Sequence, residues 1–242
     1  MASLAGVLVL LGLMVLLDTY AASEPPARTN RTGMVTGSVS MSAVNGHSTL
    51  FPPHLGYGVN VRDPDNLDVL FAPLGFEWIK LYEQYDALPT TRLPYKVLYR
   101  LQLNGPPDDL DAWGEHMQAV AHAGRGRVEA YEIGNEPNQS WQWGDHVPDP
   151  DEYVAALRVA YASIKAVDPD VLVVSGGLGP VGRIQATPQG EGKPGNNGAS
   201  MDEWAYARIM FSQCETGCFD AFGYHPFGFT YPPETPADSV EN

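Results

Sequence analysis

Segments with the periodicity of a strand and segments with the periodicity of a helix follow one another from residue 55 onward, and this alternation favours an α/β fold. The expected strands are 56–61, 76–82, 96–103, a run from 128 that stops at 134, 171–175 and 219–225. The expected helices are 65–72, 110–123, 151–167 and 201–213. Because strands that alternate with helices form parallel βαβ units, the chain is predicted to build a parallel sheet.

The fourth expected strand ends in a distinctive way. Tyr131 and Ile133 suit a strand, and Pro137 stops it because proline cannot donate to a sheet ladder. This places Glu136 at the carboxyl end of a buried strand with Asn135 beside it. Ligands bind at that end of the strands in α/β sheets and barrels. The alternative is a strand-to-loop turn whose glutamate is simply solvated.

Other polar and aromatic residues are expected at or after neighbouring strand ends. They are Asn60, Lys80, Tyr82, Arg100 or Gln102, Trp141, Trp143, Tyr224 and His225. Aromatic faces in a polar cleft suit the C–H faces of sugar rings, and carboxylates supply the acid chemistry that glycosidic bonds need. Each has a structural alternative: buried tyrosines with bonded hydroxyls, a lysine along the rim, tryptophans that pack a loop, and a structural histidine.

Composition and motifs exclude several other functions. The net charge of −15 argues against nucleic acid and anionic membrane surfaces as partners. The sequence 176–179 is Gly-Gly-Leu-Gly, but Pro180 follows without a phosphate-binding lysine, so a tight loop is the better interpretation. The only cysteines, Cys214 and Cys218, are too few ligands for a metal site and could close a small loop in an oxidising compartment. We expect neither a metal nor an organic cofactor.

The amino terminus has the pattern of an export signal. Residues 4–17 form an apolar run, and a small-residue cleavage site follows at 21–23. We interpret residues 1–23 as a signal peptide or an uncleaved membrane anchor, 24–50 as a flexible linker, and 51–242 as the folded domain. The protein is therefore predicted to be secreted, or anchored with its domain outside the cytoplasm.

The segment 131–138, Tyr-Glu-Ile-Gly-Asn-Glu-Pro-Asn, resembles the fourth-strand signature of clan A glycoside hydrolases, which include families 5 and 39. Segment 55–60 resembles their first strand, 75–80 their second, and 219–226 their sixth. The resemblance implies a (β/α)₈ TIM barrel with Glu136 as general acid/base and Asn135 at the sugar 2-hydroxyl. It also implies that Tyr224 or His225 lines the sugar site. Many members carry Arg where this chain has Lys80.

The resemblance further implies a retaining O-glycosyl hydrolase that acts on a polysaccharide or oligosaccharide and whose nucleophile is a second Glu on strand seven. Only six strands are expected here, so the chain is interpreted as a partial barrel, truncated after strand six, and as inactive on its own. Two alternatives remain: a non-catalytic carbohydrate-binding derivative of the barrel, and another barrel enzyme such as a lyase. The oligomeric state is not predicted.

Overall fold

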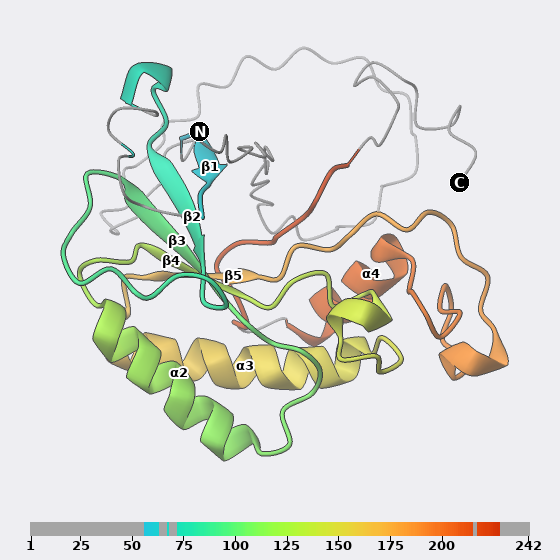
Figure 1. The fold of residues 1–242 in the computed structure, drawn as a ribbon. Helices are drawn as coiled ribbons and strands as arrows, with labels where there is room; N and C mark the ends of the chain where they lie inside the picture. The colour runs from blue at the N-terminus through green and yellow to red at the C-terminus, as the bar shows by residue number, and fades with distance from the viewer. Residues whose placement is uncertain (1–55, 63–66, 68–71, 215–216, 228–242) are drawn as a thin grey trace, which may run out of the picture. The chain divides into compact units, whose positions relative to one another are not determined.

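Five parallel strands form one sheet, in the order β1-β2-β3-β4-β5 (Figure 1). They belong to a computed structural model that describes residues 56–62, 67, 72–214 and 217–227. The strands are β1 (Gly58–Asn60), β2 (Trp78–Tyr82), β3 (Lys96–Leu101), β4 (Ala130–Ile133) and β5 (Leu172–Ser175). Each strand pairs in parallel with the next in the chain. The predicted α/β class with a parallel sheet is confirmed.

Within the described residues, three helices connect or follow these strands, and an aspartate caps the start of each. They are α2 (Leu110–Gly124), α3 (Pro150–Val167) and α4 (Glu203–Gln213). The carboxylates of Asp109, Asp149 and Asp202 accept hydrogen bonds from free backbone N–H groups of the first turns. Shorter 3₁₀ turns are η1 (Ala72–Leu74), η2 (Ser140–Gln142) and η3 (Pro188–Gly190). Figure 1 shows α2 and α3 side by side on one face of the sheet.

The two faces of the sheet differ in what they bury. On the face toward α2 and α3, alternate strand residues join the main hydrophobic core: Ile79, Leu81, Val97, Tyr99, Leu101, Tyr131, Ile133 and Val173. The other face carries a smaller cluster of Trp78, Leu98, Ala130, Val174 and Ala221. One step further along the strands, this second face becomes polar, with Tyr82, Arg100 and Glu132 side by side in register. This polar row lies toward the carboxyl ends, where the candidate site forms.

The expected sixth strand is replaced by two isolated parallel bridges, Val174 to Ala221 and Leu178 to Tyr224. Side chains take over hydrogen bonds that a regular ladder would make. The Asp220 carboxylate accepts from the N–H of Val173 at 2.8 Å, and the Ser175 hydroxyl accepts from the N–H of Gly223 at 2.9 Å. The sixth strand is therefore predicted at the right place and in the right direction, but the segment does not form a regular strand.

Several predictions lie outside the described residues. These are the export signal, the linker, and nearly all of the helix expected at 65–72. Cys214 and Cys218 form a disulfide with their Cα atoms 5.4 Å apart, which closes the expected small loop. Among the described residues, no helix is long and apolar enough to cross a membrane. Nor does this part of the chain gather three or more His, Cys, Asp or Glu side chains in a way that could hold a metal ion.

Candidate active site

Glu136 sits in a tight turn directly after β4, at the carboxyl edge of the sheet. Gly134, with φ of +79°, and Glu136, with φ of +43°, are both in the left-handed region. A β-carbon on Gly134 would also lie 3.3 Å from the side chain of Leu103. The N–H of Glu136 donates to the carbonyl of Gly177 at 2.9 Å and fixes the turn. A non-glycine residue held in this region is strained, and such strain concentrates at functional sites.

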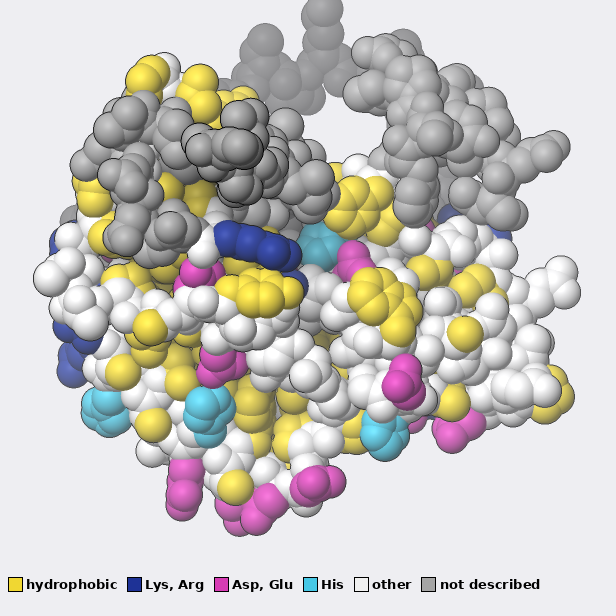
Figure 2. Space-filling model, in the orientation of Figure 1, with side chains coloured by type: hydrophobic (Ala, Val, Ile, Leu, Met, Phe, Trp, Pro, Cys, Tyr) yellow, Lys and Arg dark blue, Asp and Glu magenta, His cyan; other side chains and the backbone are white. Residues whose placement is uncertain are grey.

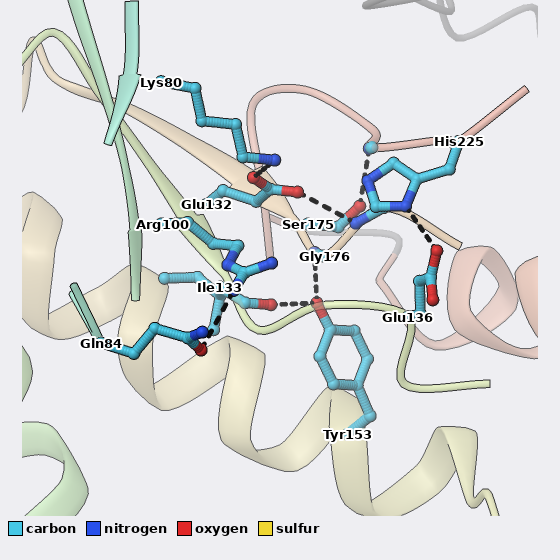
Figure 3. Close-up of polar contacts among 12 residues, drawn as sticks. Lys80, Gln84, Arg100, Glu132, Ile133, Glu136, Tyr153, Ser175, Gly176 and His225 are labelled. Atoms are coloured by element: carbon cyan, nitrogen blue, oxygen red, sulfur yellow. Dashed lines mark hydrogen bonds and ion pairs between the residues drawn. The ribbon is translucent and has the colours of Figure 1, made fainter. Parts of the chain in front are cut away.

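The carboxylate of Glu136 has a different partner on each oxygen. Its Oε1 lies 2.8 Å from Nδ1 of His225 (Figure 3). Its Oε2 accepts from Nε2 of Gln139 at 3.2 Å. His225 is itself fixed, because its backbone N–H donates to the carbonyl of Leu178 at 3.0 Å. The side chain of Glu136 is only 10 % exposed. The arrangement therefore holds one carboxylate in a single orientation at the sheet edge.

A second carboxylate, Glu132, is buried on the polar face of the sheet. It forms an ion pair with Lys80, and the N–H of Gly177 donates to its Oε1 at 3.2 Å. Burial alone would raise the pKa of the Glu132 carboxyl. The charge of Lys80, followed by those of His225 and Arg100, outweighs burial and leaves the pKa below its usual value. Glu132 is therefore ionised, and the positive charge of Lys80 balances its negative charge.

The ring of Tyr82 lies close to two cationic groups: Arg100, which is beside it in the polar row, and Lys80, two residues earlier on β2. The guanidinium carbon of Arg100 is 4.5 Å from the Tyr82 ring centre, and Nζ of Lys80 is 5.6 Å away. Burial raises the pKa of Tyr82 to about 12, with Glu132 adding to it and Arg100 opposing it. Tyr82 therefore stays protonated at neutral pH, so its hydroxyl can donate or accept a hydrogen bond and its ring can stack.

The glycine-rich loop after β5 packs between these groups. A β-carbon on Gly177 would collide with the ring of His225, and one on Gly179 would collide with Gln139 and lie 3.0 Å from Cδ of Glu136. Tyr153 fastens the start of the loop, because its hydroxyl donates to the carbonyl of Ile133 at 2.9 Å and accepts from the N–H of Gly176 at 2.7 Å. The glycines therefore serve close approach to side chains, in agreement with the predicted tight loop.

The remaining predicted residues lie at different depths. Asn60 ends β1, is half-buried and lies in register with Lys80. Asn135 is half-buried next to Glu136, and within the described residues its side chain makes no hydrogen bond. Tyr224 is half-buried beside Leu178, and burial raises its pKa.

The two loop tryptophans differ sharply in how much of each side chain is exposed to solvent. Trp141 is 62 % exposed, whereas Trp143 is 1 % exposed and packs edge-on against Tyr153, with ring centres 5.9 Å apart. Trp143 is therefore a core residue and is not placed to bind a sugar, because its ring fills the space between the loop and α3.

Figure 2 shows a histidine beside an acidic side chain on the viewed face, with hydrophobic side chains around them.

Sequence reasoning missed Glu132 and Gln139. Glu132 had a readable signal: it is a charged residue inside an apolar strand, at the alternate position that faces the same side as Lys80 after pairing. Gln139 had none, because its role depends on the turn that follows Glu136. The buried side chain of the adjacent Asn138 bonds to both backbone groups of Gly179, which joins this turn to the glycine-rich loop.

No family model matches the chain, and no curated protein matches its sequence. Solved structures with a similar arrangement include a family 39 glycoside hydrolase from Bacteroides cellulosilyticus WH2. It is 20% identical, with a TM-score of 0.45, over 70% of this chain and 37% of that one. A monomeric beta-xylosidase from Caulobacter crescentus CB15 is 16% identical, with a TM-score of 0.38, over 67% of this chain and 49% of the xylosidase.

The catalytic domain of the major endoglucanase from Xanthomonas campestris pv. campestris is 18% identical, with a TM-score of 0.32, over 57% of this chain and 55% of the endoglucanase. The chain thus spans less than two thirds of each of these three proteins.

Proposed function

We propose that this chain is part of a retaining O-glycosyl hydrolase of the (β/α)₈ type, with Glu136 as its general acid/base. The observation that carries the proposal is the carboxylate of Glu136 at the carboxyl edge of a parallel sheet, held between His225 and Gln139. General acids must be within hydrogen-bond reach of the proton they transfer and must keep one orientation through the reaction. Both contacts serve that requirement.

In the first step, protonated Glu136 gives its proton to the leaving glycosidic oxygen; in the second, it takes a proton from the attacking water. His225, 2.8 Å from Oε1, can donate to the carboxylate once the proton has left. The nucleophile of this mechanism is a second carboxylate about 5–5.5 Å from the acid. Glu132 is unsuited to that role, because Lys80 neutralises it and Gly177 bonds it. We assign the nucleophile to a second glutamate, on strand seven of the barrel that the resemblance implies.

The substrate in this proposal is a polysaccharide or oligosaccharide. Asn135 beside Glu136 would contact the sugar 2-hydroxyl, and Tyr82, Tyr224 and the exposed Trp141 offer aromatic surface. The reaction requires no metal or organic cofactor. The amino-terminal pattern supports a secreted or membrane-anchored protein, where polysaccharides are encountered.

The proposal is tested with aryl glycosides of both anomeric configurations, together with calorimetric titration of oligosaccharides. Turnover that disappears in Glu136→Gln but persists in Glu115→Gln, which changes an exposed glutamate on α2, would support the assignment. A protein that neither binds sugars nor cleaves them would refute it.

The second candidate is a non-catalytic carbohydrate-binding barrel derivative. It is favoured by one feature of the described residues: of the two buried carboxylates near the carboxyl end of β4, Glu132 is paired with Lys80, which leaves Glu136 as the one carboxylate for acid chemistry. Saturable sugar binding without turnover, in the parent chain and in Glu136→Gln alike, is the result expected of this candidate, and turnover that depends on Glu136 would exclude it.

A further inference from the structure

An exposed aromatic ring is connected to Glu136 through one intervening side chain. The indole N–H of Trp141 donates to Oε1 of Gln139 at 2.6 Å, and Nε2 of Gln139 donates to Oε2 of Glu136 at 3.2 Å. The ring of Trp141 nevertheless remains 62 % exposed. A large apolar surface is thus held at the protein surface by its polar edge.

The hydrogen bonds from Trp141 through Gln139 to Glu136 form what we call the relay. The chemistry of its two end groups fixes the orientation of the Gln139 amide. An indole nitrogen can only donate, so the oxygen of the Gln139 amide must face Trp141. The amide nitrogen is then left to face Glu136, whose Oε2 accepts the hydrogen bond. Reversing the amide would lose both hydrogen bonds. Trp141 therefore makes Gln139 a permanent donor to one oxygen of the carboxylate.

The backbone around the relay is held from two sides. The N–H of Gln139 donates to the carbonyl of Glu136 at 2.9 Å, and the N–H of Ser140 donates to the carbonyl of Ala199 at 2.8 Å. Gln139 also forms a bridge with Ser200. A ring mounted on such a turn loses little freedom when a ligand stacks on it, which favours binding.

The relay and His225 engage opposite oxygens of the same carboxylate. His225 lies close to Gly177, and its charge acts on Glu132, which is buried on the polar face of the sheet. Trp141 is linked to the other oxygen of Glu136, through Gln139. The acid transfers its proton to the oxygen that joins the cleaved sugar to its leaving group. If the cleaved sugar lies on the His225 side of the carboxylate, over the polar face of the sheet, the leaving group lies toward Trp141.

We propose that Trp141 is the stacking platform for an uncharged pyranose unit on the leaving-group side of Glu136, and that Gln139 is the positioning residue that couples this platform to the acid. This inference rests on the proposed function. It makes the site selective for a sugar, rather than a small alcohol, as the leaving group.

The test uses the ¹⁵N-labelled protein, whose five tryptophans give one indole signal each. The Trp141→Phe variant identifies the Trp141 signal. Cellobiose, xylobiose, mannobiose, laminaribiose and chitobiose are titrated in turn, each beside the methyl glycoside of its single sugar. The variants are Trp141→Ala, Trp141→Phe and Gln139→Leu. Trp204→Ala is the matched control, because Trp204 is 56 % exposed on α4.

We expect at least one disaccharide to shift the Trp141 indole signal. Trp141→Ala should then weaken that disaccharide by about tenfold, the equivalent of about 1.4 kcal/mol, and its methyl glycoside by much less. Trp141→Phe should lose only part of the affinity, since it keeps a ring. Trp204→Ala should change nothing. In Gln139→Leu, the Trp141 signal should no longer follow the protonation of Glu136 during a pH titration.

Disaccharides that shift His225 and Glu136 signals but not the Trp141 indole would overturn the platform and leave the proposed function standing. Equal weakening of both ligand types in Trp141→Ala would overturn the platform in the same way. A panel that perturbs no signal at all would count against both the platform and the proposed function. An indole signal that titrates unchanged in Gln139→Leu would overturn the relay.

Discussion

Replacing Lys80 by methionine gives the sharpest test of the buried charges behind the site. The change keeps a side chain of similar length but leaves the Glu132 carboxylate, which is 4 % exposed, without its ion-pair partner. Removing one partner of a buried pair costs about 3–5 kcal/mol, because the remaining charge stays buried and unpaired. Lys80 is 15 % exposed, so we take the lower end, about 3 kcal/mol.

For a domain of this size, each kcal/mol corresponds to about 2–4 °C in the melting temperature, so Lys80→Met should melt about 6–12 °C below the parent chain. Urea unfolding followed by circular dichroism measures the free energy directly. The matched control is the double variant Lys80→Met with Glu132→Gln, which removes the stranded charge and should recover much of the loss. A Lys80→Met variant within about 0.5 kcal/mol of the parent chain would refute the reasoning.

The same variant has a predicted pH dependence. The folded-state pKa of Glu132 lies below its ordinary value of 4.5, so the pair stabilises the fold fully above that pH and less as pH falls through the folded-state value. Without Lys80, the effect of burial is opposed by less positive charge. The stability difference between the parent chain and Lys80→Met should therefore be larger at pH 7 than near pH 3.

Three further predictions concern the surroundings of the site. Tyr153→Phe should cost about 1–3 kcal/mol in urea unfolding, because it removes the partner of two buried backbone groups; a loss as small as that of Tyr161→Phe, whose hydroxyl makes one 3.4 Å bond, would contradict this. In an ultraviolet titration of the parent chain and Tyr82→Phe, the difference in phenolate absorbance between the two reports the ionisation of Tyr82. This difference should appear near pH 12, and its appearance near pH 10 would be inconsistent with the buried ring. Gly177→Ala should displace the ring of His225 from Glu136, so that both residues' NMR signals shift; unchanged signals would show that the loop has room to adjust.

The sequence predicts most of the sheet because its signals are local. Apolar runs locate β2 to β5 within a few residues, glycine directly follows β4 and β5, and aspartates mark the starts of α2, α3 and α4. The segment 219–225 deviates for a reason that no local pattern contains. Two side chains replace backbone groups in its hydrogen bonds with β5: Asp220 from the segment itself and Ser175 from β5.

The site divides in the same way. Glu136 and His225 were predictable from their places after strands, and the structure brings them within 2.8 Å of each other. Trp141 and Trp143 are both tryptophans of the same loop. The 3₁₀ turn Ser140–Gln142 nevertheless places Trp141 at the surface and Trp143 in the core. Side chains two residues apart point in different directions in such a turn, and sequence alone does not show where the turn begins.

The proposed chemistry depends most on the position of Glu136 relative to a glycosidic bond. A crystal structure of the Glu136→Gln variant with a bound oligosaccharide tests it most directly, because that substitution keeps the shape of the side chain and prevents proton donation. We predict a glycosidic oxygen within about 2.6–3.2 Å of the substituted side chain, at the carboxyl edge of the sheet. A sugar bound elsewhere on the protein, or no oligosaccharide bound at all, would contradict the central claim.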